Sequence, residues 1–257
     1  MWQGKTVSVA LPTYHEKDSI RACIDGFFET GVVDEVVVCN NNAIAGTSEE
    51  VARTRALEVF EPRQGYGWSC RCALAATRGD LVVLAEPDGS FVPADVLKLL
   101  AYSDAFDVVF GSRTHRSCIG PGANMGPFLR WGNRAVAKYL ELLFETAPLS
   151  DVGCTMRLLS REVLERVLPR ARVGGSQFGP ELMILCLLSG ASSIEIPLQY
   201  RSRVGKSMVT GNPRRALTLG LEMIALISAL RVKHGIDKQG IGPLTGSPPG
   251  SAGPDRS

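Results

Sequence analysis

The sequence predicts an α/β fold with a mostly parallel, Rossmann-like sheet flanked by helices on both faces. Short apolar runs alternate along the chain with segments whose apolar residues recur at helical spacing, and this alternation is typical of doubly wound sheets. Polar residues follow several of the runs directly, as expected where parallel strands end at one edge of a sheet. An apolar content of 45% and a charged content of 21% suit an ordinary globular protein with a core.

The first part of the chain contains four predicted strands, each a short run rich in Val or Leu. Pro12 ends the first strand, Ser48 is expected to cap the second helix, and Gly79 follows the third helix as its C-cap. Strands that are joined through helices lie parallel, because such crossovers return the chain to the same edge. The expected strands are 6–11, 32–39, 57–60 and 81–85, and the expected helices are 20–30, 49–54 and 68–78.

The second part of the chain continues the pattern less regularly. Residues 114–127 are rich in Gly, Pro, Ser and Asn and show no periodicity, so we expect a long mobile loop of a kind that is often functional. Residues 238–257 are dominated by Gly, Pro and Ser, and we expect a disordered tail there. The expected strands are 107–111, 151–159 and 193–200, and the expected helices are 93–102, 128–144, 162–168, 180–188 and 214–233.

Composition excludes several classes of protein. The net charge is +2 and no segment is densely basic, which argues against an extended nucleic-acid surface. The seven cysteines are odd in number and form no C-x-x-C pair, so we expect neither a zinc site nor a disulfide framework. This use of cysteine indicates a reducing compartment. The sequence has no signal-peptide pattern at its start and no uncharged apolar run of about 18 residues. A cytoplasmic, enzyme-sized domain is the resulting prediction.

The strand at 81–85 ends in an acidic turn. Glu86 and Asp88 stand one residue apart, and Gly89 then permits a tight turn. In parallel α/β sheets ligands bind at the carboxyl ends of strands, and hard cations such as Mg²⁺ take one or two carboxylates together with substrate phosphates. The turn is therefore a candidate metal site, with an acidic loop that binds nothing as the alternative.

Four loops at strand ends resemble, in order, the motifs of the family 2 glycosyltransferases, which have the GT-A fold. The family pattern has a P-x-[YF]-N-E-like loop, a V-D-D-G-S-x-D-G-T loop, an N-x-G-x-G loop and a D-x-D motif. In this chain both expected aspartates of the second loop are asparagines. The resemblance covers about residues 5–210, and the corresponding loops are 12–16, 40–47, 63–67 and 86–88.

The resemblance implies a GDP- or UDP-sugar donor and a Mg²⁺ or Mn²⁺ cofactor. Asn41 could accept the imide N–H of a base through its carbonyl oxygen, but it is uncharged, so the choice between uracil and guanine stays open. Asp88 stands at the position of the metal ligand, with Glu86 at the first position of the D-x-D motif. The residues that the resemblance assigns to the nucleotide sugar are Pro12, Tyr14, Glu16, Asn41, Arg63, Gly65, Gly67 and Glu86.

The second half of the chain resembles the polyprenyl-phosphate sugar synthases of this family, closest to the dolichyl-phosphate mannosyltransferase-like branch. The matching segments are Gly111-Ser-Arg113, Asp151-Val-Gly-Cys-Thr-Met-Arg157, Phe178-Gly-Pro-Glu181 and the stretch 195–207. We therefore expect one domain over residues 1–237, with a nucleotide-binding half (about 1–112) and an acceptor half (about 113–237).

A basic loop in the acceptor half suits phosphate. The loop begins at Arg201 and carries three cations within six residues, Arg201, Arg203 and Lys206. The planar fork of arginine binds phosphate bidentately. The loop could neutralise the leaving diphosphate or fix a lipid phosphate, and Arg203 is its candidate catalytic residue; a solvated basic loop is the alternative. For Arg130 a solvated helix face is an equal alternative. The acceptor-phosphate candidates are Arg113, Arg130, Arg201, Lys206 and Ser207.

The acceptor decides which catalytic groups are needed. A phosphate monoester is already anionic near neutral pH, since its second pKa is about 6, and it could attack the anomeric carbon in line, with inversion. A hydroxyl acceptor needs a base, for which Asp151 and Glu181 are the candidates; Glu181 equally suits the start of a helix.

Three functions are therefore weighed. The favoured one is an inverting, metal-dependent hexosyltransferase acting on a polyprenyl phosphate at the inner membrane face. The alternatives are transfer to a hydroxyl of a glycan or metabolite, and a degenerate nucleotide-binding protein. A nucleotidyltransferase is disfavoured, because residues 11–14 replace the glycine-rich loop that such enzymes carry after their first strand.

The last predicted helix, 214–233, is apolar on most sides and has basic residues at its ends. It could lie in the membrane interface, or it could pack on the core or on a second copy in a homo-oligomer. It is too short and too interrupted to span a bilayer.

Overall fold

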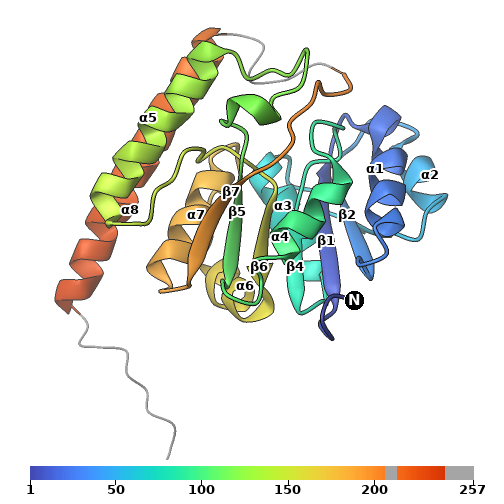
Figure 1. Ribbon diagram of the computed structural model, residues 1–257, viewed down its shortest axis with the longest axis horizontal. Helices are drawn as coiled ribbons and strands as arrows, with labels where there is room; N and C mark the ends of the chain where they lie inside the picture. The colour runs from blue at the N-terminus through green and yellow to red at the C-terminus, as the bar shows by residue number, and fades with distance from the viewer. Residues whose placement is uncertain (206–212, 241–257) are drawn as a thin grey trace, which may run out of the picture.

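The computed structural model describes residues 1–205 and 213–240, and these residues form a seven-stranded sheet in the order β3-β2-β1-β4-β6-β5-β7 (Figure 1). All pairs are parallel except that β6 runs antiparallel to both of its neighbours, β4 and β5. The mostly parallel sheet is confirmed; the inserted antiparallel strand is not predicted by the sequence pattern. The strands are β1 Val7–Thr13, β2 Glu35–Asn40, β3 Leu57–Phe60, β4 Leu81–Leu84, β5 Val108–Ser112, β6 Arg157–Ser160 and β7 Ser193–Pro197.

Helices cover both faces of the sheet, as predicted. One face packs against α1 and α4, and the other packs against α3, α6 and α7. The helices are α1 Lys17–Glu29, α2 Thr47–Ala52, α3 Tyr66–Ala76, α4 Val96–Leu100, α5 Pro127–Phe144, α6 Arg161–Val167, α7 Phe178–Leu188 and α8 Pro213–Gly240, with short 3₁₀ turns at Pro93–Asp95, Arg116–Cys118 and Leu168–Arg170.

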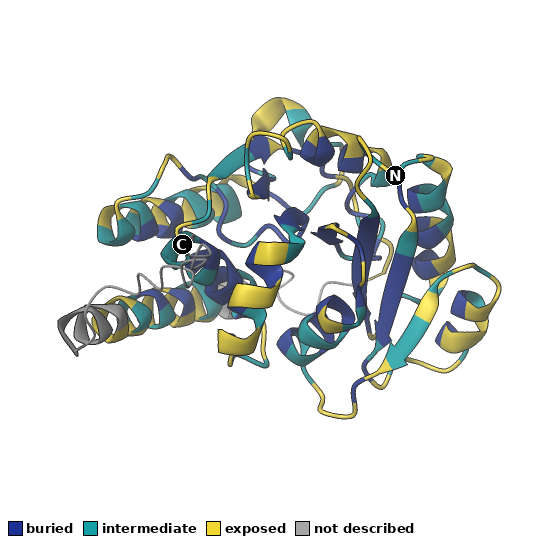
Figure 2. Cartoon of the chain, turned by 90° about the horizontal axis from the view of Figure 1, so that it is seen from below, coloured by how far each residue is buried: buried dark blue, intermediate teal, exposed yellow. Residues whose placement is uncertain are grey.

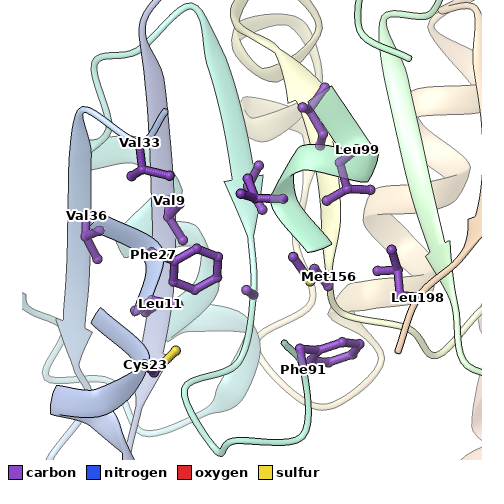
Figure 3. Packing of buried hydrophobic residues seen from close by; sticks show 14 of the residues in the cluster. Val9, Leu11, Cys23, Phe27, Val33, Val36, Phe91, Leu99, Met156 and Leu198 are labelled. Atoms are coloured by element: carbon purple, nitrogen blue, oxygen red, sulfur yellow. The ribbon is translucent and has the colours of Figure 1, made fainter. Parts of the chain in front are cut away.

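The alternation of side chains along the strands builds two hydrophobic cores. In β1, Val9 and Leu11 point to the core shared with Phe27 of α1, while Ala10 points to the opposite core. Figure 3 shows the side chains of Val9 and Leu11 from β1 beside that of Phe27 from α1. Figure 2 shows the central strands buried, an edge strand partly exposed, and the outer helices carrying exposed residues. Burial on both faces explains why the strands read as nearly continuous apolar runs.

Helices α5 and α8 lie side by side and stand away from the sheet (Figure 1). A hydrogen bond of 2.8 Å joins the hydroxyl oxygens of Tyr139 and Ser228, and the buried side chains of Val136, Met223 and Ile227 belong to the core on the α7 side of the sheet. Among the described residues, no helix is long and apolar enough to cross a membrane.

Three predicted ends of strands and helices are wrong. Pro12 lies within β1 rather than ending it, and Ser48 lies within α2, whose N-cap is Gly46 at φ 90°. Gly79 does not cap α3, because Thr77 does; its backbone N–H instead donates to Ser8 Oγ at 2.8 Å.

The structure describes all of the predicted 114–127 loop but only the first residues of the predicted 238–257 tail. The 114–127 loop contains a 3₁₀ turn, and its residue Ile119 forms a bridge with Tyr200. Residues 238–240 end α8 instead of beginning the tail. The rest of the predicted tail, 241–257, lies outside the described residues, as do Lys206 and Ser207.

Candidate active site

A cavity of about 810 Å³ opens at the carboxyl ends of the parallel strands. Its polar part includes the loops that follow β1, β2, β4, β5 and β7, and its apolar part is formed by side chains of α5 and α8. The sequence-predicted residues that line it are Pro12, Tyr14, Glu16, Asn41, Glu86, Arg113 and Arg203.

The loop after β1 is organised by Glu16. One carboxylate oxygen, Oε2, accepts the backbone N–H groups of Tyr14 and His15 at 2.7 and 2.9 Å. The other oxygen, Oε1, lies 3.9 Å from an Arg203 nitrogen. Glu16 therefore shapes the loop and adds negative charge near Arg203, while the half-exposed ring of Tyr14 borders the cavity.

Asn41 uses its side chain to hold the next loop. Its amide nitrogen donates to the carbonyl oxygens of Glu61 and Arg63 at 2.7 and 2.8 Å, and its oxygen accepts from Gly65 N at 2.8 Å and Gln64 Nε2 at 3.2 Å. This set of bonds occupies both donors and both acceptor lone pairs of the amide. In this arrangement Asn41 positions the 61–65 loop rather than offering a free acceptor to a base.

Arg63 does not line the cavity and lies over the ring of Trp68, with 4.0 Å from its Cζ to the ring centroid. Glu61 accepts two hydrogen bonds from its guanidinium, each of 2.8 Å. This carboxylate raises the pKa of Arg63, and the guanidinium in turn lowers the pKa of Glu61.

The two glycines of the 65–67 turn are required by chain packing. A Cβ on Gly65 would overlap the carbonyl oxygen of Gly174, and one on Gly67 would overlap the carbonyl oxygen of Val173. Gly67 N also donates to the Gly174 oxygen at 2.9 Å. The close approach that glycine permits here is toward the 173–174 segment.

The acidic turn carries two carboxylates in different surroundings. Asp88 is 2% exposed; its Oδ1 accepts from Ser90 N at 2.8 Å, and its Oδ2 lies 3.2 Å from an Arg203 nitrogen. Glu86 lines the cavity and accepts from the Thr155 hydroxyl at 2.7 Å. Burial, and then the charge of Asp88, raise the pKa of Glu86.

These carboxylates could hold a divalent cation only in partnership with a ligand. Among the described residues no group of three or more His, Cys, Asp or Glu side chains is arranged to bind a metal. The oxygen chemistry of Glu86 and Asp88 fits Mg²⁺ or Mn²⁺, which take remaining ligands from phosphates and water. The pairing of Asp88 with a guanidinium shows that a positive charge is accommodated at this point.

Arg113 and Asp151 form a bidentate ion pair that is largely buried. The backbone N, Nε and Nη2 of Arg113 donate to the two carboxylate oxygens at 2.9, 2.8 and 2.8 Å. Burial opposes the charge of Arg113, but Asp151 outweighs it and raises the pKa of the guanidinium. Asp151 is 0% exposed and does not line the cavity, so it orients Arg113, whose side chain does.

Glu181, the other candidate base, is also committed to backbone groups. Its two oxygens accept from Arg172 N at 2.8 Å and from Val173 N at 2.9 Å. It is buried, lies outside the cavity lining and fixes the segment that packs on the 65–67 turn. Neither candidate base therefore faces the cavity in this arrangement.

Arg157 supports the site, a role that the sequence pattern did not predict. Its guanidinium is fully buried and donates to the carbonyl oxygens of Cys154, of Thr155 at 3.3 Å and of Gly179 at 2.7 Å. It thereby holds Thr155, whose hydroxyl bonds Glu86. An arginine at the start of an otherwise apolar strand is the signal that could have identified it.

The remaining predicted phosphate ligands differ in position. Arg201 is exposed, and its backbone N–H donates to Ser90 O at 2.8 Å. Arg130 is half-buried on α5, outside the cavity lining, and its Nε has no hydrogen-bond partner among the described residues.

The apolar part of the cavity was not predicted. Phe128 and Trp131 lie one helical turn apart on α5, exposed and lining the cavity, and residues of α8 face them across the mouth. The signal was present as two aromatic residues at i and i+3 of the helix. The exposed apolar side chains that line the cavity are Phe128, Trp131, Leu217, Leu221 and Ile224.

Residues 8–168 match the sequence profile of Glycosyl transferase family 2. A low-salt glycan biosynthesis hexosyltransferase of Haloferax volcanii is 28% identical over 218 residues, which are 81% of this chain and 51% of that protein. This chain thus spans about half the length of that relative. A dolichyl-phosphate hexose transferase of the same organism is 29% identical over 203 residues, covering 78% of this chain and 85% of that protein.

Among solved structures, glucosyl-3-phosphoglycerate synthase from Mycobacterium tuberculosis in complex with Mn²⁺, UDP-glucose and phosphoglyceric acid is similar, with a TM-score of 0.66. The two chains are 21% identical, and the match covers 89% of this chain and 80% of that one. The structural likeness confirms the predicted GT-A fold.

Proposed function

The chain belongs to Glycosyl transferase family 2, and from this premise we propose that it transfers a hexose from a nucleotide sugar to a polyprenyl phosphate. The observation that carries this proposal is the two-part cavity. Its polar end gathers carboxylates and arginines, and its mouth is lined by exposed apolar side chains of α5 and α8. Such a cavity suits a phosphate attached to a long apolar chain.

The donor would bind at the polar end, along the loops after β1, β2 and β4. Glu86 and Asp88 would hold Mg²⁺ or Mn²⁺, which when bound offsets the charge of the leaving diphosphate. The complex of the Mycobacterium tuberculosis synthase with Mn²⁺ and UDP-glucose supports this assignment, because that protein has the same fold. Tyr14 and Glu16 lie at the cavity wall where the nucleoside would be received.

The acceptor phosphate would meet Arg113. This guanidinium is fixed by Asp151, so its orientation is set before the ligand arrives. A phosphate oxygen is ionised near neutral pH, with a second pKa of about 6, and needs no protein base. Because Asp151 and Glu181 both lie outside the cavity lining, the geometry favours a phosphate nucleophile over a hydroxyl. The similarity to a dolichyl-phosphate hexose transferase supports the same choice.

The prenyl chain would leave through the apolar mouth, which brings α5 and α8 to a membrane surface. Trp131 is suited to the interface, since its ring has an apolar body and a polar N–H. Arg231 and Lys233 are exposed on α8 and would face anionic headgroups. We propose peripheral contact with the cytoplasmic face of the membrane.

The test is transfer from radiolabelled UDP- and GDP-hexoses, with Mn²⁺ or Mg²⁺, to three acceptors. A polyprenyl phosphate is expected to be labelled, and 3-phosphoglycerate and free glucose are not. Labelling of 3-phosphoglycerate alone would favour the hydroxyl-acceptor alternative and reject the lipid. Nucleotide binding with no transfer to any acceptor would favour a binding protein.

Matched variants test the apolar mouth. Trp131→Ser is expected to raise the KM for polyprenyl phosphate and to reduce sedimentation with vesicles containing phosphatidylglycerol, while donor binding is kept. Phe60→Ser is the control, because Phe60 is exposed to a similar degree, 61% against 66%, on the edge strand β3. Equal loss of vesicle binding in both variants would reject the membrane contact at α5 and α8.

A further inference from the structure

Arg203 covers the carboxylate that was predicted to bind the metal. Its Nη2 lies 3.2 Å from Asp88 Oδ2 and 3.9 Å from Glu16 Oε1. Arg203 lines the cavity, whereas Asp88 does not. A cation that approached from the cavity would therefore reach the guanidinium before it reached Asp88.

The backbone sets this position of Arg203. The N–H of Val204 donates to Asp88 O, and the N–H of Arg201 donates to Ser90 O, each at 2.8 Å. Tyr200, which directly precedes the basic loop, forms an antiparallel bridge with Phe91. The basic loop is thus paired with the acidic turn from residue 200 to residue 204, and the guanidinium is held over the carboxylate.

The guanidinium is nevertheless incompletely satisfied. Its Nε is buried and has no hydrogen-bond partner among the described residues. A buried donor without an acceptor is costly, and a few such groups in native structures mark an unfilled ligand position. Since Nε is a donor on a cation, the acceptor that it lacks is an anion or a polar oxygen.

We propose that Arg203 occupies the cation position on Asp88 until the nucleotide arrives, and that metal and diphosphate displace it together. This inference rests on the proposed function. Asp88 would then hold the divalent cation, and the freed guanidinium of Arg203 would turn its fork, including Nε, to the diphosphate oxygens. The chain therefore binds the free metal weakly and the metal–nucleotide complex well, which prevents the metal from occupying the site without the donor.

The experiment measures Mn²⁺ binding by calorimetry on the full chain, with and without UDP, and with GDP in parallel. In Arg203→Gln, Mn²⁺ alone is expected to bind about three- to tenfold more tightly, because the competing ion pair is gone. With the nucleotide present, Mn²⁺ is expected to bind more weakly than in the wild type, because the diphosphate has lost its guanidinium. If Arg203 only anchored the loop, its replacement would not strengthen the binding of free Mn²⁺ while weakening the binding of Mn²⁺ in the presence of nucleotide.

Two further variants complete the test. Arg201→Gln removes the same charge from the same loop without touching Asp88, and its affinity for free Mn²⁺ is expected to stay unchanged. Arg203→Lys keeps the charge without the planar fork and is expected to lie between the wild type and Arg203→Gln.

Two results overturn the inference while leaving the proposed function intact: free Mn²⁺ binding that is unchanged or weaker in Arg203→Gln, or tightening that is equal in Arg201→Gln. A wild-type chain that binds no Mn²⁺ even with UDP or GDP overturns the proposed function as well.

Discussion

Replacing Asp151 by Asn is expected to destabilise the fold strongly. The carboxylate is 0% exposed and accepts three hydrogen bonds from Arg113 and one from Gly153 N at 3.1 Å. Asn keeps the shape, but its NH₂ group would face donors, and the charge of Arg113 would be left buried without a partner. Breaking a buried pair in this way costs about 3–5 kcal/mol. For a chain of this length, a loss of about 3 kcal/mol lowers the Tm by roughly 6–12 °C.

The assay is urea unfolding followed by circular dichroism, together with Tm, on the metal-free protein. Glu162→Gln is the control, because Glu162 pairs with Arg166 but is 81% exposed, and such surface pairs are worth less than about 1 kcal/mol. The double variant Arg113→Met with Asp151→Leu is expected to recover much of the lost stability, since it removes both charges. An Asp151→Asn protein as stable as the wild type would refute the reasoning.

Three further predictions concern the neighbouring groups. Thr155→Val removes the hydroxyl that donates to Glu86 and is expected to lower the free energy of unfolding by about 1–3 kcal/mol in urea titrations. Burial raises the pKa of Glu86, so ionising its carboxyl costs stability. In metal-free protein the Tm of Glu86→Gln is expected to equal that of the wild type below pH 4.5 and to exceed it increasingly as the pH rises. Gly67→Ala is expected to lower the free energy of unfolding by about 1–3 kcal/mol, because the added Cβ would overlap Val173 O. Gly132→Ala on α5 is the control: its Cβ would meet nothing, and it is expected to be neutral or stabilising in the same titration.

The sequence predicted the sheet from signals that are local. Valine-rich runs such as 81–84 are buried on both faces and could be read without knowing their neighbours. The place of β6 could not be read in this way, because a strand of four residues with only two apolar ones carries no mark of its direction or partners.

The candidate site was predictable as a set of loops and unpredictable as a set of contacts. Chain order alone put polar residues at the carboxyl ends of β1, β2 and β4, where ligands bind in such sheets. The sequence could not reveal that Asn41 is saturated by the 61–65 loop or that Glu181 is held by backbone N–H groups. Their assignments to base recognition and catalysis stay predictions, and the structure supplies each with a supporting role.

The sequence by itself determined the fold class, the order of the loops and the chemistry available at each strand end, because these depend on periodicity and on neighbouring residues. Only the tertiary structure decided which charges meet. Arg113 pairs with Asp151 and Asp88 with Arg203 across long stretches of chain, and α5 meets α8 to line an apolar mouth. The physical reason is that electrostatic and apolar contacts act over a few ångströms in space, whatever the distance along the chain.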